Sequence, residues 1–195
     1  FGGCAADCNP VDLNANLYLY EKNFAWFYRE LGLKGARTWD KKAAARCALI
    51  QKYCFEPSDG LFYDYNYVTE RRSDILSAAV FNLLWAGIPT DKQAASLVRA
   101  LGRLECAHGI AACEDGSRTA DFQWDYPNAW ASFNTLAVIG LDKYGFKLES
   151  GRVAAKYLDS VSSIYGGTGQ LWEKYNAVTG DIDVKSEYAM PGDFM

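Results

Sequence analysis

Apolar residues recur at spacings of three and four along most of the chain, which is typical of amphipathic α-helices. Asn9 and Pro10 come before the first such segment and suit the start of a helix, and Gly32 suits its end. The apolar positions between them are Leu13, Leu17, Tyr20, Phe24, Phe27 and Leu31. They give one apolar face, so we expect a first helix over about 10–31.

The same period predicts five more helices and no strand. Their expected ranges are 38–55, 74–85, 90–104, 125 or 126 to 144, and 150–165. Short connections alternate with long ones that are rich in Tyr, Trp, Asp and Glu. Helical hairpins packed in a ring place all their long loops on one rim. We therefore expect an all-α fold in which residues 1–195 form a single domain, with the helical hairpins of an (α/α)6 toroid. Six helices are half of the twelve in such a ring, so the toroid is expected to be incomplete.

Composition and charge narrow the range of partners. The chain has 195 residues, a formal net charge of −4 and a pI near 5.1. Nucleic acids and anionic membranes both need a cationic face, so neither is expected as a partner. No run of about 18 apolar residues is present, so no membrane span is expected. Aromatic residues make up 15% of the chain, which is enough for rings to serve both a core and a ligand.

The cysteines and the single histidine offer little for metal or cofactor chemistry. His108 has no obvious catalytic partner, and no pair of cysteines has zinc-site spacing, so we expect no metal and no cofactor. Cys47 and Cys54 fall on the apolar stripe of the second helix and suit its core. Cys106 and Cys113 would form a disulfide if their loop closes. We favour reduced cysteines and a cytoplasmic protein, and leave a periplasmic or secreted location open.

Three of the long loops combine aromatic rings with carboxylates and amides. This combination suits sugars, because the apolar face of a pyranose lies on an aromatic ring while its hydroxyls bind fixed polar groups. Carboxylates also carry out glycoside hydrolysis. We therefore expect a small carbohydrate as the ligand. The expected contacts are Asp64 and Tyr65 in the first loop, Gln123, Trp124, Asp125, Asn128 and Trp130 in the second, and Trp172 and Glu173 in the third.

Several of these residues also have purely structural interpretations. Asp125 would serve as an N-cap if the fifth helix begins there. Trp130 lies on the apolar stripe of that helix and is equally suited to the core. Trp124 lies outside the helix among polar residues, so ligand contact is the favoured interpretation. Asp59-Gly60 is typical of a turn alone, and residues 172–175 would otherwise form a charged surface patch.

The segment Gln123–Ala131, QWDYPNAWA, resembles the second signature of trehalases, glycoside hydrolase family 37, although Ser132 stands where the family has proline. Other stretches are similar to family motifs in the same order along the chain. They are Pro10–Asn14 (PVDLN), Gly60–Asn66, and Trp172–Tyr175 (WEKY). The resemblance therefore covers nearly the whole chain.

The resemblance implies an (α/α)6 barrel that hydrolyses α,α-trehalose or a related α-glucoside with inversion. Ser186-Glu187-Tyr188 is similar to the family's GEY core, so the resemblance assigns Glu187 as the general base, although the family's glycine run is missing before it. The family's general acid lies upstream of the PVDLN motif. We therefore expect the chain to be the C-terminal portion of such a catalytic domain, and related family 63 α-glucosidases remain an alternative.

Two consequences follow from an incomplete domain. A base without its acid loses most of the rate, so the fragment is expected to be weakly active or inactive. An apolar seam should be exposed where the missing helices pack, and the chain is expected to pair with itself or with the missing half. A non-catalytic carbohydrate-binding α/α domain remains an alternative, and a helical scaffold ranks last.

Overall fold

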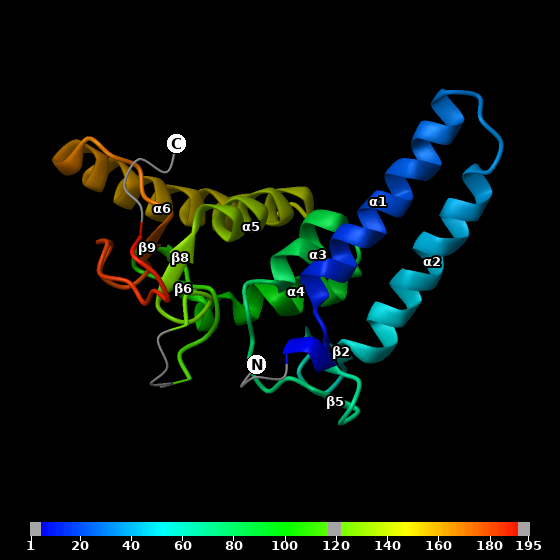
Figure 1. The fold of residues 1–195 in the computed structure, drawn as a ribbon, viewed down its shortest axis with the longest axis horizontal. Coiled ribbons are helices and arrows are strands. Elements are labelled where there is room, and N and C mark those ends of the chain that lie inside the picture. The colour runs from blue at the N-terminus through cyan, green and yellow to red at the C-terminus, as the bar shows by residue number, and fades with distance from the viewer. Residues whose placement is uncertain (1–4, 117–121, 191–195) are drawn as a thin grey trace.

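The computed structural model describes residues 5–116 and 122–190, and this part of the chain contains six α-helices. Figure 1 shows them as inclined pairs that are linked by loops of very different length. Their bounds are α1 Val11–Glu30, α2 Ala36–Tyr53, α3 Val80–Ala86, α4 Asp91–Arg99, α5 Ala131–Lys143 and α6 Lys147–Thr168. The prediction of a mainly helical fold with six helices is confirmed.

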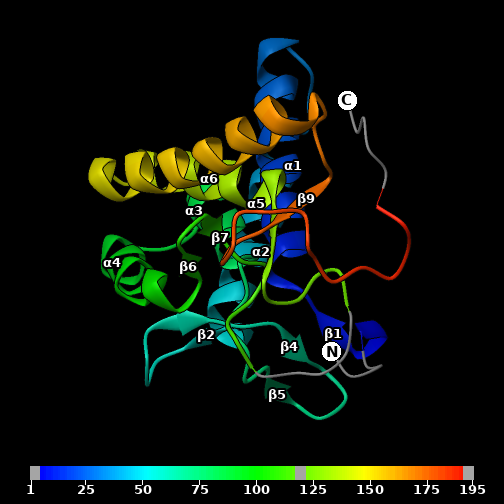
Figure 2. The same cartoon turned by 90° about the vertical axis from the view of Figure 1, so that its left-hand side faces the viewer.

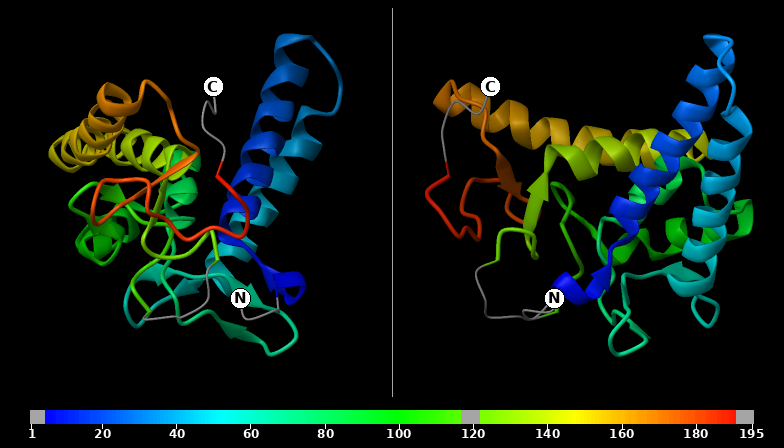
Figure 3. Two further views of the ribbon diagram at one scale, coloured as in Figure 1. Left: turned by 60° about the vertical axis from the view of Figure 1, so that its left-hand side comes forward. Right: turned by 45° about the vertical axis from the view of Figure 1, so that its right-hand side comes forward.

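The helices form an inner and an outer set. The inner helices α1, α3 and α5 pack in succession, while α2 packs on α1 and α6 packs on α5. Short connections follow each inner helix, and long ones lead from each outer helix to the next inner one. The predicted alternation of short and long connections is therefore confirmed, and the long loops gather at the N-terminal ends of the inner helices (Figures 1 and 3).

Local sequence explains where several elements begin and end. Gly32 adopts a φ of 63° just after α1, a left-handed conformation that glycine tolerates best. Thr90 and Gln93 form the expected capping box at the start of α4. Asp59 and Gly60 form the predicted turn, in which Gly60 has a φ of 77° and Asp59 Oδ1 accepts a hydrogen bond from Leu61 N at 2.9 Å.

The expectation of no strand is wrong, because nine short strands lie outside the helices in the described part of the chain. They form small antiparallel sheets with the orders β1-β4-β5, β2-β3, β6-β7 and β8-β9. Their bounds are β1 Cys8–Asn9, β2 Phe55–Glu56, β3 Leu61–Phe62, β4 Tyr65–Asn66, β5 Arg71–Arg72, β6 Glu105–Cys106, β7 Gly109–Ile110, β8 Asn128–Trp130 and β9 Lys174–Asn176. Strands of two or three residues are too short to show a period of two in sequence.

Two helix starts also differ from the prediction. The third helix begins at Val80 rather than near 74, because Ser77 and Ala78 pair instead with Cys113 and Ala112 of a distant loop. The fifth begins at Ala131 rather than at 125 or 126, because β8 pairs with β9. In both cases a tertiary backbone partner replaces the first helical turn, which is information that local periodicity does not contain.

The apolar face of α1 is real but is mostly open to solvent. The buried residues of α1 are Val11, Ala15, Glu21 and Ala25, which differ from the large residues of the predicted stripe. Five of those large residues, Leu13, Tyr20, Phe24, Phe27 and Leu31, are 46–69% exposed. The main core lies instead around α3 and the inner part of α5. Among the described residues, every helix is too short or too polar to cross a membrane.

Candidate functional site

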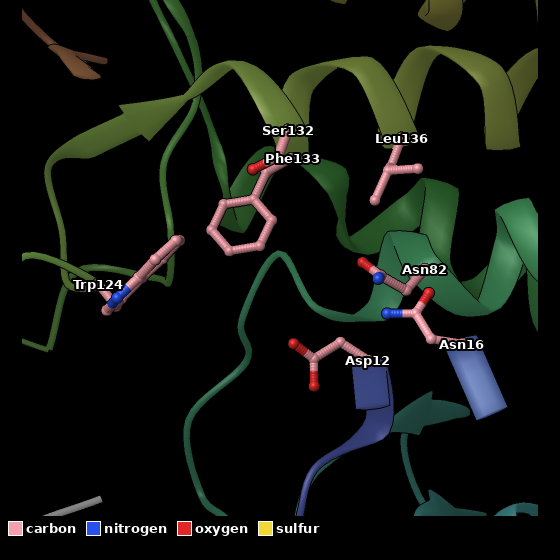
Figure 4. Close-up of a pocket in the computed structure, with 7 residues that line it drawn as sticks. All are labelled: Asp12, Asn16, Asn82, Trp124, Ser132, Phe133 and Leu136. Carbon is pink, nitrogen blue, oxygen red and sulfur yellow. The ribbon is translucent and has the colours of Figure 1, made fainter. Parts of the chain in front are cut away.

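A cavity of about 340 Å³ opens where the first turns of the three inner helices meet the loop before β8 (Figure 4). This volume lies at the small end of the range of about 300–1,000 Å³ that is typical of ligand pockets. The residues that line it are Asp12 and Asn16 of α1, Asn82 of α3, Ser132, Phe133 and Leu136 of α5, and Trp124 of the loop. The loop before β8 and the three inner helices therefore share this cavity.

Two tryptophans of the loop and β8 form a stacked pair beside this cavity. The ring centroids of Trp124 and Trp130 are 4.0 Å apart, and the rings are nearly parallel at 8°. Trp130 is 7% exposed, whereas Trp124 is 52% exposed and also meets the ring of Phe133 edge-on at 5.5 Å. Trp130 thus belongs mainly to the packed interior, and it supports Trp124, which presents the indole at the cavity.

The loop that carries Trp124 is fixed through the backbone of Gln123. The carbonyl of Gln123 accepts hydrogen bonds from Trp130 Nε1 at 3.1 Å and from Asn128 Nδ2 at 2.9 Å. Asn128 Nδ2 also donates to Lys185 O at 2.6 Å, and Asn128 Oδ1 accepts from Lys185 N at 3.0 Å. Asn128 is 0% exposed. Its amide holds the loop of Gln123 to the segment of Lys185, and we call this set of hydrogen bonds the clamp. Its predicted contact with sugar stays a prediction.

Glu187 comes back to this site from the C-terminal segment. That segment follows α6, adds β9 to β8 and then passes the tryptophan loop (Figures 2 and 3). Glu187 Oε2 lies 3.4 Å from Gln123 N, the residue next to Trp124, and the Glu187 side chain is exposed. The structure therefore brings the carboxylate named as the general base to the loop that carries the exposed indole.

A buried lysine joins the third loop to the second. Lys174 is 0% exposed, and its Nζ lies 3.0 Å from Glu173 Oε2, 5.0 Å from the Trp130 ring centroid and 4.7 Å from the Tyr188 ring centroid. Tyr188 OH donates to both oxygens of Glu173, at 2.7 and 2.6 Å. The cluster explains why residues 172–175 are not a surface patch: their charges are paired against the aromatic rings next to Glu187.

These contacts set the ionisation of Glu173 and Tyr188. Burial alone would raise the pKa of Glu173, but the hydrogen bonds from Tyr188 and Lys174 outweigh it and hold the pKa below its usual value. The same hydrogen bond to Glu173 is the main cause that raises the pKa of Tyr188 to about 12. Glu173 therefore stays an anion and Tyr188 stays a hydrogen-bond donor at neutral pH. Their hydrogen bond holds Tyr188, the residue that follows Glu187, to the third loop.

Asp125 is buried and does not cap a helix, so the N-cap interpretation is wrong. It is 5% exposed, and its Oδ1 accepts hydrogen bonds from Cys113 Sγ and Tyr126 N at 2.8 and 2.9 Å. The cap position of α5 is Trp130. Asp125 thus ties the tryptophan loop to the strand-like segment around Cys113.

Asp64 and Tyr65 come from the loop between α2 and α3, where Tyr65 belongs to β4. Asp64 is 8% exposed, and its Oδ1 accepts a hydrogen bond from Val11 N at 2.7 Å, so it holds the first turn of the helix that carries Asp12. Burial is the main cause that raises the pKa of Asp64 to about 6, and the charge of Asp12 adds to it. Tyr65 packs its ring 4.9 Å from that of Tyr53. Sugar contact by either residue stays a prediction.

The structure gives several cysteines and His108 local contacts, and Cys47 is only partly buried. Cys106 and Cys113 are thiols, so the disulfide that a closed loop would allow between them is not formed. Cys54 is buried in the core as predicted. His108 Nδ1 lies 2.7 Å from Ser160 Oγ, a contact that fixes a loop to α6.

Three polar residues of the cavity were missed by the sequence analysis. Asp12, Asn16 and Asn82 line the cavity but were not among the predicted ligand contacts. The spacing of four between Asp12 and Asn16 was available as a signal, because it places two polar groups on one face of the first turns of a helix. Nothing in the sequence signalled Asn82, which lies within an apolar helix.

The comparisons with known proteins agree along the whole chain. The profile of the Trehalase family matches residues 2–194. The cytosolic neutral trehalase of Neurospora crassa is 34% identical over 98% of this chain, and that of Saccharomyces cerevisiae is 33% identical over 98%. The chain spans only 30% and 28% of the lengths of these two relatives.

Solved structures give the same result. The structure is similar to that of the neutral trehalase Nth1 from Saccharomyces cerevisiae, with a TM-score of 0.84, 33% identity, and coverage of 93% of this chain and 36% of that one. A GH63 mannosylglycerate hydrolase from Thermus thermophilus has a TM-score of 0.77 at 17% identity, over 89% of this chain and 41% of that one, which shows a shared fold alone. By sequence and by structure, this chain belongs to the trehalase family.

Proposed function

We propose that this chain is the C-terminal part of an (α/α)6 catalytic domain that hydrolyses α,α-trehalose or a related α-glucoside with inversion. The observation that carries the proposal is the position of Glu187, whose carboxylate lies 3.4 Å from Gln123 N beside the exposed indole of Trp124. Family membership supports the substrate class, and the alternation of inner and outer helices supports the toroid. The same membership favours a trehalase over a family 63 α-glucosidase.

In the proposed reaction Glu187 is the general base. The carboxylate takes a proton from a water molecule as that water attacks the anomeric carbon, and the general acid protonates the leaving oxygen from the opposite side of the sugar. An inverting pair needs its carboxyl groups about 6.5–9.5 Å apart, so that the water fits between base and sugar. The exposed side chain of Glu187 leaves room for that water. The general acid is proposed to come from a part of the domain outside this chain.

In this proposal the residues around Glu187 hold its carboxylate in place. Lys174, Glu173 and Tyr188 are paired with one another, and Asn128 joins the Glu187 segment to the tryptophan loop. A base that is preorganised in this way does not have to be ordered during the reaction, which is how positioning contributes to rate. The proposal gives these residues a positioning role and leaves the chemistry to Glu187.

The exposed apolar face of α1 supports an incomplete ring. Tyr20, Phe24, Phe27 and Leu31 are each at least 46% exposed on one helix, a pattern that marks a contact surface. We propose that this face packs against the rest of the toroid, and that the isolated chain pairs through it with a second copy.

A cytosolic location is proposed as well, because the trehalases of Neurospora crassa and Saccharomyces cerevisiae that match this chain are named cytosolic.

The proposal is tested by measuring glucose release from α,α-trehalose. The chain alone is expected to be nearly inactive, since the loss of general acid catalysis removes about 10²–10⁴-fold of rate. In a complete domain that contains this chain, the first glucose anomers seen by NMR should be an equal mixture of α and β, as inversion at one centre requires.

Glu187→Gln in that domain should abolish turnover and preserve sugar binding, and unchanged turnover would remove Glu187 from the role of base.

A non-catalytic carbohydrate-binding domain is the alternative that the same experiment separates. The stacked indoles and the cavity would serve binding alone equally well. A complete domain that binds trehalose but releases no glucose would establish that alternative.

A further inference from the structure

The turn that follows β9 is organised by the side chain of Asn176. Asn176 Oδ1 accepts hydrogen bonds from Val178 N at 2.9 Å and from Thr179 N at 3.2 Å. Gly180 closes the turn with a φ of 76°, and its N donates to Asn176 O at 2.8 Å. Asparagine side chains commonly organise turns in this way, so the residue types of this short segment determine the turn.

The chain contains the same turn a second time, after β4. Asn66 Oδ1 accepts hydrogen bonds from Val68 N at 3.0 Å and from Thr69 N at 2.9 Å. Glu70 then has a positive φ of 55°. The sequences NYVTE and NAVTG share Asn, Val and Thr at the same spacing. A contact that Asn176 makes and Asn66 does not make is therefore not needed for the turn itself.

Asn176 makes such a contact with the segment that carries Glu187. Asn176 Nδ2 donates to Asp183 O at 2.8 Å, and the Asn176 residue is 8% exposed. Among the described residues, Asn66 Nδ2 has no acceptor of this kind. The amide of Asn176 thus joins its own turn to the backbone four residues before Glu187.

His108 fixes this turn to the body of the protein. His108 N donates to Ala177 O at 2.8 Å, and His108 Nδ1 lies 2.7 Å from Ser160 Oγ, a side chain of α6 that is 3% exposed. The imidazole lies so close to Gly180 that a Cβ there would come within 2.5 Å of Nδ1. The turn is therefore held to α6 through His108. We call the set of Asn176, Gly180, His108 and Ser160 the seat.

The Glu187 carboxylate is held mainly through its backbone. In the described part of the chain it accepts one hydrogen bond, from Gln123 N at 3.4 Å, which is longer than the usual range of about 2.7–3.2 Å. The backbone before it is held at two points, because Asn176 binds Asp183 O and the clamp binds both N and O of Lys185. The position of the carboxylate therefore depends on the backbone that leads to it.

We propose that Asn176 and His108 are positioning residues for Glu187, and that the seat sets where residues 183–187 pass the tryptophan loop. The role of Glu187 as general base rests on the proposed function, whereas the seat rests on contacts within this chain alone. The base of an inverting enzyme has to hold one water molecule against the anomeric carbon. A displacement of about 1 Å in such a site lowers the rate about 10²-fold. The seat therefore acts on kcat and has no part in sugar binding or proton transfer.

Hydrogen exchange of the 195-residue chain tests the contact between the seat and the Glu187 segment. Asn176→Asp keeps the Oδ1 that the turn needs and removes the Nδ2 that binds Asp183 O. The backbone amides of residues 183–187 should therefore exchange about fivefold faster or more. Asn66→Asp is the matched control, because it makes the same change in the same turn, and it should leave exchange in residues 183–187 unchanged.

Two glycines give a second matched pair. Gly180→Ala places a Cβ against the His108 ring, whereas a Cβ at Gly145 meets no heavy atom within 4 Å. Both glycines have a positive φ, 76° and 84°, so both variants carry similar backbone strain. Gly180→Ala should therefore speed exchange in residues 183–187, and Gly145→Ala should not. His108→Ala removes the ring itself and should act in the same direction as Gly180→Ala.

The catalytic consequence is measured in a complete domain that contains this chain. Asn176→Asp and Gly180→Ala should lower kcat for α,α-trehalose about tenfold or more and leave KM unchanged. The two control variants should keep the wild-type turnover. Azide separates a displaced base from a loss of folded enzyme, because azide attacks the anomeric carbon without giving up a proton and so needs no base. Azide should raise the turnover of the two seat variants, with β-glucosyl azide as the product, and should not raise that of the wild-type domain.

The outcomes separate the seat from the proposed function. If residues 183–187 exchange equally fast in the wild-type chain, Asn176→Asp and Gly180→Ala, the seat is overturned, whatever the role of Glu187. If exchange rises while kcat stays the same, or kcat falls without rescue by azide, the positioning role is overturned and the base assignment still depends on Glu187→Gln. If Glu187→Gln leaves turnover unchanged, the base and its positioning residues are overturned together, while the exchange rates still decide whether the seat holds the segment.

Discussion

Two tryptophans in this chain have almost the same exposure and quite different surroundings. Trp124 is 52% exposed and Trp26 is 53% exposed. Trp124 lies flat on Trp130 in a loop that is held by hydrogen bonds of Gln123 and Asn128, next to a cavity with polar groups. Trp26 lies on α1 in tilted contact with Phe27, 5.0 Å away, near other exposed apolar residues.

The difference between the two regions shows what exposure alone does not reveal. Around Trp124 the rings come with carboxylates and amides, a combination that matches the two-sided chemistry of a sugar. Around Trp26 the exposed surface is apolar along the helix, a pattern that fits packing against another protein surface. Figures 1 and 3 show the α1–α2 hairpin extending away from the loops around β8 and β9, so the two regions are separate in space.

The clamp at Asn128 offers the strongest test of this contrast. Asn128→Ala removes three hydrogen bonds at a 0% exposed position and leaves backbone groups of Gln123 and Lys185 without them. We expect a loss of about 3 kcal/mol in the free energy of unfolding, from unpaired buried groups at about 1–3 kcal/mol each. Urea unfolding at pH 7 measures it. The control Asn23→Ala on exposed α1 should change stability by less than about 0.5 kcal/mol, and equal effects of the two variants would refute the clamp.

A smaller effect is expected from the buried carboxyl of Asp64. Its pKa is raised to about 6 in the folded chain, mainly by burial, whereas an unfolded Asp has a pKa of about 3.9. The folded state therefore holds this proton to higher pH than the unfolded state does. Its contribution to stability falls as pH rises from about 4 to about 6, by a total of about 2–3 kcal/mol.

Asp64→Asn tests this pH dependence, because asparagine still accepts the hydrogen bond from Val11 N but does not ionise. We expect the variant to be more stable than the wild-type chain at pH 7 and to lose that advantage at pH 4. Thermal unfolding across this range measures the difference, and a difference that is constant with pH would contradict the assignment. A successful result would show that the carboxyl of Asp64 is protonated where it holds Val11, in the first turn of the helix that carries Asp12 at the cavity.

The smallest effects on stability are expected from the two tryptophans themselves. Trp124→Ala should cost about 1 kcal/mol, the order expected for one aromatic pair, and Trp26→Ala about 0.5 kcal/mol or less. Their other effects should differ in kind. Trp124→Ala should abolish the fluorescence response to glucosides, and Trp26→Ala should weaken self-association in analytical ultracentrifugation. If each variant affected both properties, the two regions would not be functionally separate.

Much of the architecture follows from local pattern. The periods of three and four placed all six helices, and the capping box at Thr90 and the turn at Asp59-Gly60 were found from residue types. The predicted site residues divide in the structure. Glu187 comes to the loop that carries Trp124, while Asn128, Asp125 and Asp64 are buried and make hydrogen bonds that hold neighbouring elements.

Local sequence is enough to determine the six helices, the alternation of their connections, the acidic and aromatic character of the long loops, and the motifs of the trehalase family. These features depend on residues a few positions apart, because helical hydrogen bonds, caps and turns all join near neighbours in the sequence. Contacts between distant parts of the chain decide that α3 and α5 begin late, that Asn82 faces a cavity, and that the large residues of α1 remain exposed. The two late helix starts depend on partners more than ten residues away, Ala112 for Ala78 and Lys174 for Trp130, and local periodicity carries no information about such pairing.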